Sequence, residues 1–128
     1  MPRLGLGPAL SLALFAAAGC ATGYDHPKPR ELPRNITFAG SWDSTWGKMV
    51  LMQEGHHVHG TFTGFREGAV SGDLDGDIFH FVWDQRVPQS HGHGYLQITP
   101  DGTHLEGRWG YMKDDGDGGR WAADKDNY

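Results

Sequence analysis

From residue 38 onward the chain alternates apolar and polar residues in short runs, which are separated by turns rich in glycine and aspartate. Side chains two positions apart on a strand share a face, so this alternation is typical of strands with one apolar face and one polar, solvent-exposed face. No window carries the 3.6-residue period of a helix of ordinary length. The pattern predicts strands over residues 38–44, 48–54, 57–65, 68–74, 77–85, 92–99, 103–111 and 118–123.

Within these strands a glycine is repeatedly followed, two positions later, by a bulky apolar residue. Glycine inside a strand marks a bend or the close approach of a neighbouring group, so the repeat predicts a sheet that curls on itself. Short turns force sequential strands to pair. We therefore expect an all-β fold, an eight-stranded antiparallel up-and-down β-barrel whose interior is filled by side chains or holds one small ligand. The glycine pairs are Gly40/Trp42, Gly60/Phe62, Gly72/Leu74, Gly107/Trp109 and Gly119/Trp121.

The phase of the alternation predicts which side chains fill the barrel. The opposite phase is polar and carries His59, His93, Tyr95 and His104, which are expected to face water. The second strand is an exception, because residues 49–52 are apolar on both faces. The predicted inward set is Trp42, Val58, Phe62, Val70, Leu74, Phe79, Phe81, Trp83, Leu96, Ile98, Leu105, Trp109, Tyr111, Trp121 and Ala123.

The first 35 residues follow a different pattern. The apolar run over residues 9–18 is too short for a permanent membrane-spanning helix and is typical of a secretory signal. Residues 21–35 contain three prolines and no apolar periodicity, which indicates an extended tether. The predicted organisation is a signal peptide (1–19), a cysteine with a proline-rich tether (20–35), a barrel domain (36–124) and a short tail (125–128).

The sequence Ala17-Ala18-Gly19-Cys20 resembles the lipobox of bacterial lipoproteins, with Ala17 where that family usually has leucine. The chain has no second cysteine, so Cys20 cannot form an internal disulfide. The resemblance implies acylation of Cys20 and a lipid anchor in the membrane. In that family an aspartate after the cysteine retains the protein in the inner membrane, and this chain has Ala21 there. The resemblance therefore also implies an outer-membrane lipoprotein of the cell envelope. Ordinary signal cleavage within the alanine run is the alternative.

Three segments, Gly40-Ser41-Trp42-Asp43, Gly60-Thr61-Phe62-Thr63 and His80-Phe81-Val82-Trp83-Asp84, resemble the avidin fold. The resemblance implies a small barrel with tryptophans that point inward. It does not extend to biotin, because Phe62 replaces the tyrosine expected after Gly-Thr and Ser44 replaces the expected asparagine. A pocket built to hydrogen-bond its ligand loses much of its affinity when such groups are missing.

Composition excludes several function classes. The formal net charge is −5 and no stretch forms a basic patch, so nucleic acid is not an expected partner. The sequence has no nucleophile elbow, zinc-protease helix or phosphate loop, so neither an enzyme nor a cofactor is expected. The acidic segments 73–77 and 114–119 lack the spacing of an EF-hand and are interpreted as hairpin turns.

Two groups of residues are candidates for a binding site. If the first strand runs away from the tether, alternate turns gather at the far mouth of the barrel, where a small ligand would enter. The candidate ligand-binding residues there are Trp46, Arg66, Trp83, Arg86, His91, His93 and Tyr111. Histidines near the opposite end form the alternative, a divalent-metal site made by His57, His59 and His104. Solvated side chains on the wet face are the simpler interpretation of these histidines.

These observations predict a lipid-anchored, non-enzymatic envelope barrel that binds a small molecule or an envelope protein. A histidine-based metal-binding lipoprotein and a purely structural envelope protein with a filled barrel are the two alternatives.

Overall fold

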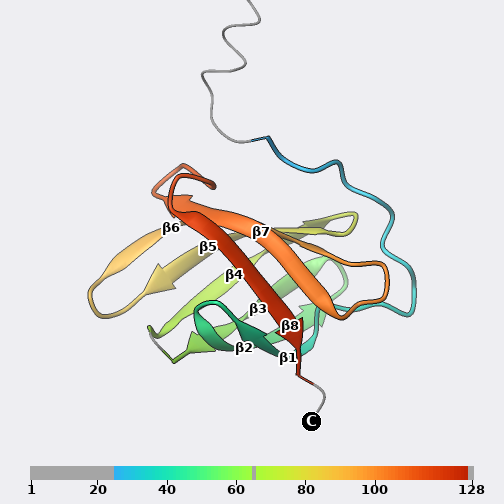
Figure 1. Cartoon of the computed structure of the whole chain (residues 1–128), viewed down its shortest axis with the longest axis horizontal. Helices are drawn as coiled ribbons and strands as arrows, with labels where there is room; N and C mark the ends of the chain where they lie inside the picture. Colours follow the sequence, from blue (N-terminus) through green and yellow to red (C-terminus); the bar gives the residue numbers. More distant parts are fainter. Residues whose placement is uncertain (1–24, 65, 127–128) are drawn as a thin grey trace, which may run out of the picture.

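The computed structural model describes residues 25–64 and 66–126, which form one closed β-barrel (Figure 1). The predicted strand bounds are shifted by at most two residues, as at the sixth strand, which begins at residue 90 instead of 92. Among the described residues no helix has the length and apolar character needed to span a membrane. The strands are β1 (Gly40–Ser44), β2 (Gly47–Glu54), β3 (His57–Thr63), β4 (Gly68–Asp75), β5 (Ile78–Gln85), β6 (Ser90–Ile98), β7 (His104–Tyr111) and β8 (Gly119–Lys125).

Each strand pairs antiparallel with its neighbours in the chain, and β8 pairs with β1 to close the sheet. At this closing seam Trp42 lies opposite Lys125 and Ser44 lies opposite Ala123. Two further hydrogen bonds extend the seam below the paired residues, from Lys125 Nζ to the Ala39 carbonyl (2.8 Å) and from the Asp126 amide to the Ser41 carbonyl (2.9 Å). The prediction of an eight-stranded up-and-down barrel is confirmed.

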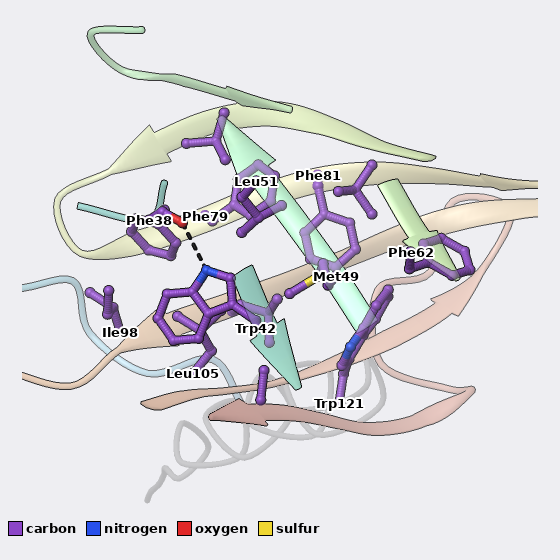
Figure 2. Close-up of a cluster of buried hydrophobic side chains, with 14 of the residues drawn as sticks. Phe38, Trp42, Met49, Leu51, Phe62, Phe79, Phe81, Ile98, Leu105 and Trp121 are labelled. Atoms are coloured by element: carbon purple, nitrogen blue, oxygen red, sulfur yellow. Dashed lines mark hydrogen bonds between the residues drawn. The ribbon is translucent and has the colours of Figure 1, made fainter. Parts of the chain in front are cut away.

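The alternation along the strands fills the barrel interior with apolar side chains, which meet from all sides (Figure 2). Trp42 is completely buried, and its Nε1 donates a hydrogen bond to the Phe38 carbonyl at 2.9 Å. On β2 only one apolar face is covered, because Val50 and Met52 are 43% and 55% exposed on the outer surface. The buried cluster comprises Phe38, Trp42, Met49, Leu51, Val58, Phe62, Val70, Phe79, Phe81, Trp83, Leu96, Ile98, Leu105, Trp121 and Ala123.

Glycines in the strands let the backbones of neighbouring strands approach closely. A Cβ atom at Gly72 would lie 1.8 Å from the His80 carbonyl oxygen, and one at Gly107 would lie 1.8 Å from the Tyr95 carbonyl oxygen. Neither position can accept a side chain without a backbone shift. The close approach that the glycine repeat predicts is therefore confirmed at these two positions.

Several residues differ from the prediction in how far they are buried. Tyr111 is 49% exposed at the end of β7, while Trp109 and Leu74 are half-buried. Tyr95 was expected to face water but is only 5% exposed, and the ring of His26 packs against it with centroids 4.7 Å apart. This burial raises the pKa of the Tyr95 hydroxyl. The outer face of β6 is therefore covered by a segment that precedes the barrel.

That segment, residues 26–38, is called the strap. In Figure 1 it runs along one side of the barrel before it enters β1. Leu32 and Ile36 pack against the core, and the Lys28 carbonyl accepts a hydrogen bond from Gln97 Nε2 at 3.2 Å. His26 bonds Asp115 in the turn between β7 and β8, at 2.7 Å. The expectation of an extended tether is therefore wrong for residues 26–35, since hydrogen bonds and apolar packing hold them on the barrel.

The strap is bound to the barrel at Asp77, in the turn between β4 and β5. Its carboxylate accepts hydrogen bonds from the Arg30 amide (2.8 Å), from Arg30 Nε (2.9 Å) and from Gln97 Nε2 (3.0 Å). Its own amide donates to the Arg30 carbonyl at 2.8 Å. Burial alone raises the pKa of Asp77, but these donors outweigh it and hold the pKa below the ordinary carboxyl value.

Candidate functional site

The two ends of the barrel are built differently. The strap enters β1 at the lower end, where Phe38 is fully buried. At the upper end the turns between β1 and β2, β3 and β4, β5 and β6, and β7 and β8 surround a cavity of about 160 Å³. It is lined by Trp46, Phe62, Arg66, Trp83, Gln85, Pro88, Ser90, Trp109, Tyr111 and Trp121.

Trp109 is the central ring of the cavity wall. Its centroid lies 5.1 Å from that of Trp46, 5.6 Å from that of Trp83 and 5.1 Å from that of Tyr111, in edge-to-face arrangements in each case. A Cβ atom at Gly118 would lie 2.4 Å from the Trp109 ring, so glycine is required there for the ring to take this place. Four rings from three parts of the chain therefore form one continuous aromatic wall.

Hydrogen bonds hold one ring of this wall, Trp83, and the turn that carries a second ring, Trp46. Trp83 Nε1 donates to the Gly110 carbonyl at 3.0 Å, which joins β5 to β7 across the barrel mouth. The amide of Trp46 donates to Ser44 Oγ at 3.1 Å, and that hydroxyl donates to the Gly47 carbonyl at 2.7 Å. The indole bond thus fixes the orientation of the Trp83 ring, and the bonds of Ser44 shape the turn that carries Trp46.

The polar part of the lining comes from the turns flanking the cavity. Gln85 is 8% exposed and its Nε2 donates to the Pro88 carbonyl at 2.7 Å, which closes the turn between β5 and β6. Ser90 follows on β6, and Arg66 comes from the turn between β3 and β4. Among the described lining residues Arg66 is the only charged side chain, and none is a carboxylate, histidine or cysteine.

The acidic turn between β7 and β8 uses its carboxylates to cap its own backbone. Asp114 Oδ1 accepts hydrogen bonds from the amides of Gly116 (2.8 Å) and Asp117 (3.0 Å). Asp117 Oδ1 in turn accepts from the Tyr111 amide at 3.0 Å. This is the role expected of aspartate in a turn, and it directs these oxygens toward the loop.

Four of the seven residues predicted for the mouth line the cavity, namely Trp46, Arg66, Trp83 and Tyr111. Arg86 is exposed on the turn between β5 and β6 and does not line it. His91 and His93 are also wrong, because on β6 the inward positions at this height belong to Gly92 and Gly94. His93 bonds the Met112 carbonyl on the outside of the barrel.

The sequence prediction missed several lining residues, mainly because it assigned the rings to the core. Phe62, Trp109 and Trp121 lie on inward positions near the upper ends of their strands, so they belong to the core and to the cavity at once. A usable signal was present, since an inward residue at the open end of a barrel faces the mouth. Gln85, Pro88 and Ser90 carried no comparable signal in the sequence.

The predicted metal ligands are not brought together. His57 and His59 share the outer face of β3, with ring centroids 5.8 Å apart, and Asp73 lies 3.2 Å from His57 Nδ1. His104 lies on β7, which is separated from β3 by three strands in either direction around the barrel. It bonds Glu106 (2.9 Å) and Asp124 (2.7 Å), which raise the pKa of His104.

The predicted grouping of His57, His59 and His104 is therefore wrong. Over residues 25–64 and 66–126 no set of three or more histidine, cysteine or acidic residues has an arrangement that could hold a metal ion. Cys20, the predicted lipidation site, lies outside the described residues.

Comparison of the chain with family models, with curated proteins and with solved structures gives no match. The resemblances to lipoproteins and to avidin therefore rest on the sequence motifs and remain predictions. The cavity presents flat apolar surfaces and a few polar groups, a composition common to small-molecule sites.

Proposed function

We propose that this protein is a lipid-anchored, non-enzymatic barrel of the cell envelope that binds a small ring-containing molecule in the cavity at its upper end. The observation that supports this proposal is the aromatic wall around a cavity of about 160 Å³. A protein cavity of about 150 Å³ accommodates a benzene-sized molecule. Aromatic rings stack well in offset and edge-to-face arrangements, so a flat ligand has favourable partners on several sides.

Binding is favoured over catalysis by the chemistry of the lining. General acid–base catalysis needs a group that changes protonation near neutral pH, most often histidine or a carboxylate. The described residues around the cavity supply an arginine, an amide, a serine and aromatic rings. Such groups orient and hold a ligand, and the serine has no base beside it in this lining.

The proposal predicts that benzyl alcohol, used as a neutral single-ring probe, shifts the indole N–H signals of Trp46, Trp83 and Trp109 in a two-dimensional NMR spectrum. Trp42 lies at the opposite end and is completely buried, so its signal should not move. Tyr111→Ala should lower the affinity about three- to tenfold, since an aromatic contact contributes about 0.5–1.5 kcal/mol. The neighbouring Met112→Ala is the matched control, because Met112 is 66% exposed and does not line the cavity.

Shifts spread evenly over the protein, or equal losses in the two variants, would count against a site in this cavity.

The envelope part of the proposal predicts that Cys20→Ser abolishes lipid attachment. The native protein should incorporate labelled palmitate and remain in the washed membrane pellet, because each buried CH₂ of an acyl chain contributes about 0.8 kcal/mol. The serine variant should incorporate no label and should either remain unprocessed or enter the soluble fraction. A processed serine variant that stays in the pellet would contradict the lipid anchor.

A further inference from the structure

The strap runs along the outer face of β6 toward the upper end of the barrel when it is followed back from β1. The Lys28 carbonyl accepts a hydrogen bond from Gln97, next to the lower end of β6. Two residues earlier in the chain, the His26 ring packs against Tyr95, which lies two positions higher on the same strand. The His26 ring also bonds Asp115, in the turn between β7 and β8, at 2.7 Å. The chain therefore leaves the described barrel beside an upper turn, and not at the lower end where β1 begins.

Only a short stretch of chain separates this point from the predicted lipidation site. Cys20 precedes His26 by six residues. A chain spans at most about 3.3–3.6 Å per residue, so the Cα atoms of these two residues lie within about 22 Å of each other whatever the conformation between them. A lipid anchor at Cys20 therefore holds the turn between β7 and β8 close to the membrane surface.

The upper turns on this side of the barrel carry exposed apolar side chains. Val87 is 80% exposed in the turn between β5 and β6, and Met112 is 66% exposed at the start of the turn between β7 and β8. The two turns are neighbours, since the Met112 amide donates a hydrogen bond to the His91 carbonyl at the start of β6. The turns at the lower end contain no large apolar residue. Transfer of exposed apolar side chains from water into lipid is favourable, so the upper end is the one suited to a membrane surface.

Each of these apolar side chains has a basic neighbour. Arg86 precedes Val87 and Lys113 follows Met112, and both basic residues are exposed. Long basic side chains can lay their stems along apolar surface while the charged group stays among polar headgroups. Because the turn between β7 and β8 also contains three aspartates, we expect apolar insertion to contribute more than net charge.

Resting on the proposed function, we infer that the upper end of the barrel lies on the lipid bilayer that holds the Cys20 anchor, with Val87 and Met112 inserted among the headgroups. Tyr111 lines the cavity and is 49% exposed beside Met112. The cavity mouth then faces the membrane. A small ring-containing ligand would reach it from the membrane interface, a region that favours amphipathic rings.

A partner protein is the main competing occupant of this surface, because exposed apolar side chains around a cavity are also found at protein interfaces. The short distance to the anchor favours the bilayer, since the anchor brings the membrane to this end in every copy of the protein. A bilayer and a protein also differ in what they admit, because oxygen dissolves in lipid and is kept away from groups enclosed in a protein contact. The two occupants are therefore separable by experiment.

The test uses the mature, lipidated protein in vesicles of phosphatidylcholine and phosphatidylglycerol, with a spin label on one introduced cysteine. Val87→Cys and Met112→Cys place the label at the upper end, and His56→Cys and Pro100→Cys place it on exposed lower turns. Oxygen enters the bilayer and a water-soluble nickel chelate does not, so the ratio of their collision rates with the label reports its immersion. This ratio should rise at 87 and 112 when the protein is bound to vesicles, relative to the same labelled positions in soluble Cys20→Ser protein. It should not change at 56 and 100.

Met112→Ser and Met52→Ser form a matched pair, because both methionines are exposed (66% and 55%) but Met52 lies on the outer face of β2. With the label at Val87→Cys, Met112→Ser should move the ratio back toward its value in solution. Burial of a side chain of this size favours the inserted orientation about tenfold or more. Met52→Ser should leave the ratio unchanged.

The outcomes separate this inference from the proposed function. In protein that is lipidated and bound to vesicles, equal ratios at the two ends, a rise at the lower end alone, or equal effects of the two methionine variants would overturn the membrane contact and leave the proposed function standing. Upper labels that become shielded from both reagents would show a protein contact and would overturn it as well. If Cys20 carries no acyl chain, the envelope part of the proposed function fails, and the inference fails with it.

Discussion

Replacement of Trp42 by alanine is expected to lower the free energy of unfolding by about 3–5 kcal/mol, the range for removal of a large buried aromatic side chain. Trp42 is 0% exposed, and Lys125 Nζ lies 4.7 Å from the centroid of its ring. The alanine variant also leaves the Phe38 carbonyl without its indole donor. Small domains have a total stability of about 5–15 kcal/mol, so chemical or thermal unfolding should show a large shift.

A second pair of substitutions separates the ring from its hydrogen bond. Trp121 is 2% exposed, nearly as buried as Trp42, but its Nε1 has no hydrogen-bond partner among the described residues. Phenylalanine at Trp121 removes an unpaired buried donor, whereas phenylalanine at Trp42 leaves a buried carbonyl unpaired. Trp42→Phe should therefore be more destabilising than Trp121→Phe by about 1–3 kcal/mol. Equal losses would show that the indole bond to Phe38 makes no net contribution.

The fold was predictable because one physical rule covers most of the chain. Side chains alternate across a strand, so the apolar phase identified both the strands and the buried face of each. Turns of two to seven residues then left little freedom in the order of pairing. The strap was not predictable in the same way, because a proline-rich segment without periodicity gives no signal for the surface on which it lies. Its position depends on Asp77 and Tyr95, which the sequence pattern assigned to a turn and to the wet face.

The candidate site shows that two separate conditions decide which residues line a barrel cavity. A residue must lie at the open end, and it must also point inward. His91 and His93 satisfy the first condition and fail the second, whereas Trp83 and Tyr111 satisfy both. The position of all four residues along their strands predicted that they lie at the mouth. The alternation had already placed His93 on the solvent-exposed face. The prediction that the two histidines line the cavity failed because position along the strand was given more weight than the direction of the side chain.

The lower end of the barrel is filled by packed apolar side chains, whereas the upper end holds the cavity. Near the lower end Phe38, Trp42 and Phe79 pack directly together, with Phe38 and Phe79 centroids 5.9 Å apart. Two inward positions of β6, Gly92 and Gly94, carry no side chain, and a Cβ atom at Gly92 would lie 2.8 Å from Trp83 Nε1. The Trp83 ring therefore lies against the β6 backbone, and Ser90 is the β6 side chain that lines the cavity.

The second large effect on stability is expected from Asp77→Ala, which removes the acceptor that binds Arg30 and Gln97 to the turn between β4 and β5. Loss of these charge-assisted bonds should lower the free energy of unfolding by about 2–3 kcal/mol. The strap should then detach and become more sensitive to proteases near Arg30. Asp75→Ala is the matched control, since Asp75 lies two residues earlier and is exposed. Exposed substitutions of this kind change stability by about 0.5 kcal/mol or less.

The contribution of the Asp77 carboxylate to the free energy of unfolding is expected to depend on pH. Because the folded-state pKa of Asp77 is lowered from 3.8, its ionised form is favoured by folding. This contribution of Asp77 to stability is fully present above the ordinary carboxyl pKa. It is lost as the pH falls through the lower folded-state pKa. The stability difference between the native protein and Asp77→Ala should therefore be constant from pH 7 to about pH 5 and shrink below about pH 4. A difference that stays unchanged down to pH 2, or an equal loss in Asp75→Ala, would show that the Asp77 carboxylate is not what holds the strap.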